Sequence, residues 1–180
     1  NVWGDAGIIA TNSVEHCRKL RLLRNHGMKN RDEIEIFGYN SRLDTLQAIV
    51  GNWLIGQVHD ITHKRIENAH KYDEAFASCI GVKIPVRRAH IKRVFHLYMI
   101  QVQKRDELYR FLQGRGISAK IHYPIPLFLQ QGLAHLGYKK GDFPETEKQA
   151  GAIISLPVDQ HLTIEKQQNV IEAVRAFYGA

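Results

Sequence analysis

The sequence predicts an α/β protein whose C-terminal part is a small α+β domain of two layers. After Gly81 strands and helices alternate: we expect a strand at 94–103, an amphipathic helix at 105–117, a strand at 118–126 and a final helix from Thr163. Before this part comes a helix of unusual length, from about Leu43 to Ser78, with one apolar stripe. The 44% hydrophobic and 24% charged content is that of an ordinary globular chain.

At the N-terminus the pattern predicts a turn, a short strand and a helix. The turn is GDAG (4–7), and the apolar run GIIAT (7–11) reads as a strand. Asn12 stands three residues before Glu15, which is the spacing of a helix N-cap. Apolar residues at helical spacing then predict a helix that ends by Gly27, namely Val14, Cys17, Leu20 and Leu23.

The long helix is expected to bury one face and to leave histidines on the other. Its apolar stripe lies around Ile61 and consists of Leu46, Val50, Trp53, Leu54, Val58, Ala69, Tyr72 and Phe76. His59, His63 and His70 lie opposite this stripe, so we expect them in solvent. The segment HDITH therefore predicts no zinc site, because no third ligand accompanies it.

Near the C-terminus we expect a helix from about Glu145, the short segment SLPV (155–158) and the last helix. The last helix should bury Ile164, Ile171, Val174 and Phe177. Cys17 and Cys79 have no CxxC partner, and we expect both to pack as small hydrophobic residues.

The net charge of +7 favours anionic ligands. The densest basic stretch is KIPVRRAHIKR (83–93), which contains no acid. A solvated strand edge is the favoured interpretation of this stretch, and an anion-binding surface is the alternative. No nucleic-acid-binding motif accompanies it, and no run of 18 apolar residues predicts a membrane span. We therefore expect neither nucleic acid nor membrane as a partner.

Two segments are candidates for a binding site. In FGYNSRLDTLQA (37–48), Asn40 and Arg42 precede the long helix and are suited to bind phosphate, although Asn40 or Ser41 as a simple helix cap is the alternative. In IHYPIPL (121–127), His122 and Tyr123 stand at a strand end that Pro124 and Pro126 make rigid. They are either donors that point into a cleft or a strand terminus with a buried tyrosine.

Taken in order, seven segments resemble the DegT/DnrJ/StrS family of sugar aminotransferases. They are GDAGIIATN, RLLRNHG, GYNSRLDTLQA, HLYMIQV, IHYPIPL, LGYKKGDFPETEK and SLPV. The resemblance implies the aspartate-aminotransferase fold of pyridoxal-phosphate enzymes (fold type I). The chain begins at Asn1 with no initiator methionine, and it resembles the C-terminal half of such an enzyme. The implied division is the end of the large domain (1–42), a linking helix (43–80) and the small C-terminal domain (81–180).

The resemblance also implies the chemistry. Family members transfer an amino group, usually from glutamate, to a keto group of a nucleotide-linked sugar with pyridoxal 5'-phosphate as cofactor. The Schiff-base lysine is then expected upstream of Asn1, since no lysine in this chain matches it, and the chain alone is expected to be inactive. Asn40 matches the residue that reaches the cofactor phosphate across a dimer interface. Arg42 matches a residue that binds substrate or phosphate, and His122 and Tyr123 match a pair that borders the sugar site.

A cytoplasmic homodimer with shared active sites, working in polysaccharide or antibiotic-sugar biosynthesis, is the expected setting. Two alternatives stay open. Some relatives replace the lysine with histidine and catalyse dehydration of the sugar, and the residues upstream of Asn1 distinguish the two reactions. The other alternative is a non-catalytic α+β module that holds an anionic partner with KIPVRRAHIKR.

Overall fold

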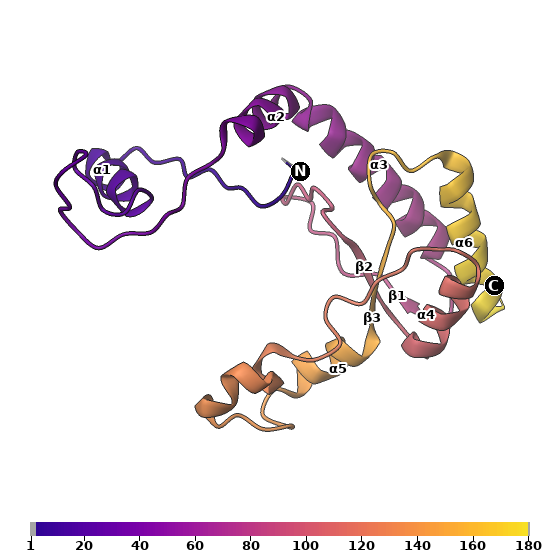
Figure 1. The fold of residues 1–180 in the computed structure, drawn as a ribbon. Coiled ribbons are helices and arrows are strands. Elements are labelled where there is room, and N and C mark those ends of the chain that lie inside the picture. The colour runs from indigo at the N-terminus through magenta and orange to yellow at the C-terminus, as the bar shows by residue number, and fades with distance from the viewer. Residues whose placement is uncertain (1–2, 180) are drawn as a thin grey trace. The chain divides into compact units, whose positions relative to one another are not determined.

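The computed structural model describes residues 3–179 and divides into two compact units, Asn1–Val58 (unit 1) and His59–Ala180 (unit 2) (Figure 1). Unit 1 holds helices α1 (Val14–Leu23) and α2 (Thr45–Ile55). Unit 2 holds most of α3 (Val58–Phe76) and all three strands. Within the described residues, no helix is long and apolar enough to cross a membrane.

In unit 1 the predicted helix forms, and its cap lies one residue later than expected. Ser13, not Asn12, is the N-cap, and its hydroxyl accepts a hydrogen bond from the backbone N–H of His16 at 3.2 Å. The predicted strand at 7–11 does not form. Its backbone pairs with no other strand among the described residues, and Ile8 and Ile9 are exposed. An apolar run becomes a strand only when a neighbour supplies the hydrogen bonds.

The predicted long helix is two helices. α2 ends at Ile55, Gly56 is its C-cap, and α3 begins at Val58. The backbone N–H of Gln57 donates to the carbonyl of Leu54, three residues back, so the last turn is tightened where glycine weakens the helix. The apolar stripe is divided as well. Its α3 end is buried through Ala69, Tyr72 and Phe76, whereas Leu46 and Trp53 at its α2 end are exposed.

Unit 2 is built on an antiparallel sheet of three strands, β1 (Val82–Lys83), β2 (Tyr98–Val102) and β3 (Ile153–Leu156), in the order β1-β2-β3. Tyr98 of β2 pairs with Leu156 and Met99 with Ser155. Alternate residues of β2 are buried, so one face of the sheet enters the core. The predicted strand at 118–126 contributes only a bridge between Lys120 and Ser155.

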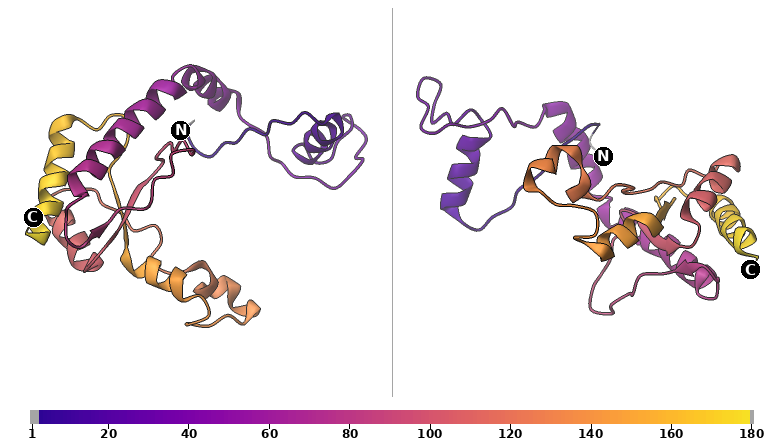
Figure 2. Two further views of the ribbon diagram at one scale, coloured as in Figure 1. Left: turned by 180° about the vertical axis from the view of Figure 1, so that it is seen from behind. Right: turned by 90° about the horizontal axis from the view of Figure 1, so that it is seen from below.

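Helices complete unit 2. They are α4 (Arg105–Gly114), α5 (Pro144–Ala152) and α6 (Ile164–Tyr178), with 3-10 turns η1 (Leu127–Leu129) and η2 (Gln131–Leu136). Side chains of α3, α4, α6 and the sheet form one core cluster, and α4 and α6 lie side by side (Figure 2). Thr163 caps α6 by accepting from the backbone N–H of Lys166, which confirms the predicted start. Ile171 and Val174 of α6 are buried as predicted, whereas Ile164 is exposed.

Candidate functional site

Asn40 lies in a segment of unit 1 that folds back on the end of α1. The backbone of Asn40 bridges that of Asn25, and the N–H of His26 donates to the carbonyl of Tyr39 at 2.8 Å. The N–H of Ser41 donates to the carbonyl of Arg24 at 2.9 Å. These bonds fix residues 39–41 on both sides of Asn40. The N-cap of α2 is Asp44, so the alternative that Asn40 or Ser41 caps this helix is wrong.

Arg42 orients the amide of Asn40. The Nε of Arg42 donates to Oδ1 of Asn40 at 3.0 Å, and its Nη1 donates to Oδ1 of Asn25 at 3.5 Å. The bond from Arg42 uses the amide oxygen of Asn40, and the Nδ2 group carries two hydrogens that it can donate. An exposed amide donor beside a guanidinium suits a phosphate group. The residues therefore fit an anionic cofactor group at this position.

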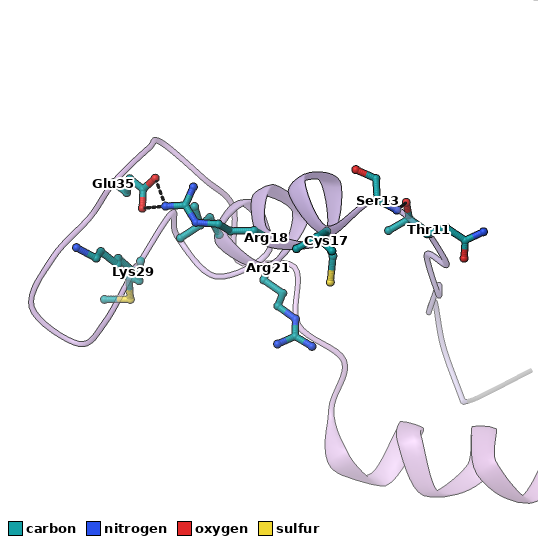
Figure 3. A pocket seen from close by; sticks show the side chains of 11 residues that line it. Thr11, Ser13, Cys17, Arg18, Arg21, Lys29 and Glu35 are labelled. Atoms are coloured by element: carbon teal, nitrogen blue, oxygen red, sulfur yellow. Dashed lines mark hydrogen bonds and ion pairs between the residues drawn. The ribbon is translucent and has the colours of Figure 1, made fainter.

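A separate pocket of unit 1, of about 640 Å³, lies beside the start of α1 (Figure 3). Its lining includes Arg18, Arg21 and Lys29, and Arg18 is paired with Glu35 at 2.6 Å. The side chain of Arg21 points away from this ion pair (Figure 3). Neither Asn40 nor Arg42 lines the pocket, so it is not the site that the sequence predicts.

In unit 2 the structure brings His122 and Tyr123 together in the segment after the Lys120–Ser155 bridge. Their rings meet edge to face, with centroids 5.5 Å apart and planes at 88°, and the peptide bond that joins them is cis. Tyr123 is 72% exposed, so the alternative of a buried tyrosine is wrong. Nδ1 of His122 is hydrogen-bonded to Oγ of Ser155 at 3.0 Å.

Tyr123 also lines a cavity of about 520 Å³. One side of the cavity is the segment from Tyr123 to Leu127, and Thr146, Gln149 and Ala150 of α5 contribute to its lining. All lining side chains are uncharged, and most of them are apolar. Such a cavity suits a neutral ligand group with both apolar and polar surface.

The basic stretch 83–93 is partly engaged within its own unit. Arg87 donates to both carboxylate oxygens of Asp73 at 2.8 Å, and Tyr98 donates to Oδ1 of Asp73 at 2.8 Å. The hydrogen bond to Asp73 raises the pKa of Arg87, and burial together with Asp73 raises the pKa of Tyr98. Arg93 donates to the carbonyl of Val86. Two of the five cations therefore stabilise the fold, which argues against a surface devoted to anions.

The histidines of α3 lie where the sequence predicts. His59, His63 and His70 are exposed, and Nε2 of His63 is 3.2 Å from Glu67. Within residues 3–179 no group of three or more His, Cys, Asp or Glu side chains is placed to hold a metal ion. Cys79 is buried and Cys17 half-buried, and both thiols are free.

Two residues with a direct part in these arrangements were not singled out by the sequence. Asn25 accepts from Arg42, and Ser155 holds the ring of His122. Asn25 has no local signal that separates it from other turn asparagines. Ser155 has one, because it is the polar member of the apolar strand IISL.

Comparison with known proteins identifies the family of the chain. The model of the DegT/DnrJ/EryC1/StrS aminotransferase family matches residues 2–175. A protein of Geobacillus stearothermophilus named pleiotropic regulatory protein is 40% identical over 178 residues, which are 98% of this chain and 48% of that protein. A dTDP-3-amino-3,4,6-trideoxy-α-D-glucose transaminase of Streptomyces venezuelae is 34% identical over 173 residues, covering 96% of this chain and 46% of the enzyme.

A solved structure gives the same result for the fold. The crystal structure of S. venezuelae DesV, in complex with a ketimine intermediate, superposes with a TM-score of 0.91 at 33% identity. It covers 94% of this chain and 46% of DesV. The chain spans about half the length of the curated relatives it matches. From the match over residues 2–175 and this shared fold, we conclude that the chain belongs to the DegT/DnrJ/EryC1/StrS aminotransferase family.

Proposed function

We propose that this chain forms part of a pyridoxal-phosphate aminotransferase that moves an amino group from glutamate to the keto group of a nucleotide-linked sugar. The observation that carries the proposal is the close agreement of its fold with DesV, at a TM-score of 0.91 over 94% of the chain. Relatives named as transaminases act on dTDP- and UDP-linked sugars, which supports a nucleotide-linked substrate here.

Asn40 is the residue of this chain that would hold the cofactor. Its Nδ2 group, oriented by Arg42, would donate hydrogen bonds to the phosphate, while Arg42 adds positive charge nearby. Pyridoxal phosphate, when bound, supplies the electron sink for amino transfer. In our proposal Asn40 serves the active site of the partner subunit in a cytoplasmic homodimer.

His122 and Tyr123 would border the sugar. The cavity beside Tyr123 carries apolar and hydroxyl groups but no charge, so it would favour the sugar ring over the diphosphate. The +7 charge of the chain favours approach of the anionic substrate as a whole.

The division of labour between domains is also part of the proposal. Residues 1–42 would complete the large cofactor domain, 43–80 would link the two domains as α2 and α3, and 81–180 would form the small domain. The Schiff-base lysine would come from the segment upstream of Asn1. A histidine at that position would instead indicate the dehydratase reaction, so reading that residue distinguishes the two.

The role of Asn40 is tested by Asn40→Ala in the full-length enzyme. Loss of a hydrogen bond to a charged phosphate costs about 1.5–3 kcal/mol, so the Kd for pyridoxal phosphate should rise about tenfold or more. Equilibrium dialysis with absorbance detection measures this Kd. Asn169→Ala, at an exposed position of α6, is the matched control and should leave the Kd unchanged. An Asn40→Ala enzyme with the wild-type Kd would contradict the phosphate role.

A further inference from the structure

Ser155 is a polar residue in the middle of an apolar core strand. It is only 4% exposed, and its neighbours in β3 are Ile154 and Leu156. Its backbone is hydrogen-bonded in both directions to Lys120, at 2.8 and 3.0 Å, and its Cα partner in β2 is Met99. The position of its hydroxyl is therefore fixed by the sheet on both sides.

The hydroxyl of Ser155 is hydrogen-bonded to Nδ1 of His122 at 3.0 Å. A serine hydroxyl has one proton to give, and a buried donor without an acceptor costs more than an acceptor with a free lone pair. The buried hydroxyl proton of Ser155 therefore finds its acceptor when Ser155 donates to Nδ1 of His122. The neutral imidazole then carries its proton on Nε2, where it is a hydrogen-bond donor.

The ring of His122 in turn supports Tyr123. The two rings stand edge to face at 88° with centroids 5.5 Å apart, so the plane of the imidazole determines which orientations of the tyrosine ring are favourable. Tyr123 lines the cavity of about 520 Å³ described above. A continuous set of contacts thus leads from a rigid core strand to the wall of the cavity.

We propose that Ser155 is a positioning residue for the sugar site: its hydroxyl selects the Nε2–H form of His122 and, through that ring, sets the orientation of Tyr123. The proposal rests on the proposed function, because it takes His122 and Tyr123 as the border of the sugar site. It adds a residue and a protonation state that the sugar site requires. In this form Nε2 of His122 carries a proton and is a hydrogen-bond donor.

The test compares Ser155→Ala with Ser155→Thr in the full-length enzyme loaded with pyridoxal phosphate. Histidine is labelled with ¹⁵N and spectra are recorded at about pH 8.5, where an ordinary histidine is neutral. His122→Gln identifies the signals. We expect Ser155→Ala to raise the population of the Nδ1–H form and Ser155→Thr to restore the wild-type spectrum. Met99→Leu, which alters packing opposite Ser155 but keeps the hydroxyl, is the control and should leave the signals in place.

A kinetic measurement tests whether the ring of His122 affects the sugar site. The probe is dTDP-3-amino-3,4,6-trideoxy-α-D-glucose, which should convert the cofactor to its aminated form in single-turnover absorbance measurements. Ser155→Ala should slow this step about five- to tenfold, the effect of one lost hydrogen bond, while the same conversion by L-glutamate keeps its rate. Unchanged imidazole signals in Ser155→Ala, or equal slowing with both amino donors, would overturn the proposal.

The two proposals fail in different ways. If the wild-type enzyme accepts neither the amino sugar nor glutamate, the proposed function is wrong. The NMR comparison does not depend on turnover, so it still decides whether Ser155 controls the form of His122.

Discussion

At the scale of single residues, several polar side chains of this protein act by fixing a neighbour. Arg42 occupies the oxygen of the Asn40 amide, and Ser155 occupies one nitrogen of His122. In the core, polar side chains hold the backbone instead: Nε2 of Gln167 donates to the main-chain carbonyl of Asn68 at 2.7 Å, and Nδ2 of Asn68 donates to the main-chain carbonyl of Asp159 at 3.0 Å. For Arg42 and Ser155, the bond takes one polar atom of the neighbouring side chain and leaves the other for a further partner.

Tyr178 gives a pH-dependent prediction at this scale. Its hydroxyl donates to the carbonyl of Gln103 at 2.6 Å, and burial, followed by Cys79 and Glu107, raises its pKa to about 12. An unfolded tyrosine loses its proton near pH 10, so the folded protein holds the proton more tightly between about pH 10 and 12. The stabilisation is complete below pH 10 and is lost as the pH rises toward 12.

We therefore expect Tyr178→Phe to reduce the alkaline loss of stability, measured by denaturant unfolding at a series of pH values. Tyr72 and Tyr98 also have raised pKa values, so part of the loss remains. Identical pH profiles for Tyr178→Phe and the wild type would disprove the role of this hydroxyl.

At the scale of elements, the Asn40 segment depends on a close approach of two backbones. A Cβ on Gly27, which has φ +74°, would lie 1.6 Å from the carbonyl oxygen of Ile36. A Cβ on Gly38 would lie 2.4 Å from the backbone nitrogen of Gly27. Only glycines let the turn after α1 and the returning segment come this close.

Gly27→Ala should therefore destabilise the turn that carries Asn40. We expect a loss of more than about 1 kcal/mol in the free energy of unfolding. Alanine would have to adopt the positive φ of Gly27, and its Cβ would clash with the carbonyl oxygen of Ile36. Thermal unfolding of the full-length enzyme and its Kd for pyridoxal phosphate should both report the change. Gly7→Ala is the control, since a Cβ there meets nothing within 4 Å. Equal behaviour of the two variants would show that the close approach is unimportant.

At the scale of the whole molecule, the two units differ in how much of their apolar surface is covered. The core cluster is drawn from residues of unit 2. Among the described residues of unit 1, Leu22 is the one buried apolar side chain, whereas Ile8, Val14, Leu46 and Trp53 are exposed. Because burial of apolar surface is the main stabilising contribution to folding, the stability of this chain resides in unit 2.

Hydrogen exchange of the 180-residue chain tests this distribution. Amides of β2, β3 and the second half of α3 should exchange slowly, and those of α1 and α2 should exchange at least about a hundredfold faster, since local opening there exposes little buried surface. Mass spectrometry of peptides from each element measures the difference. Comparable protection in α1 and β2 would contradict it.

The elements with local signals were predictable from the sequence. The amphipathic pattern of 105–117 and the helical spacing of apolar residues after Thr163 correspond to α4 and α6 in the structure. The exposure of His59, His63 and His70 followed from helical spacing alone. The strand at 7–11 and the unbroken helix at 43–78 were wrong, because the first needs a pairing partner and the second depended on a tightened turn at Gly56 and Gln57.

By itself the sequence determined the family, the helices α1, α4, α5 and α6, and the identities of Asn40, Arg42, His122 and Tyr123 as candidates. Only the tertiary structure decided how these residues are held: Arg42 bonded to the Asn40 oxygen, and His122 bonded to Ser155, 33 positions away. The reason is physical. Caps and periodicity act over a few neighbouring residues, whereas the partner of a side chain far along the chain is set by strand pairing and packing.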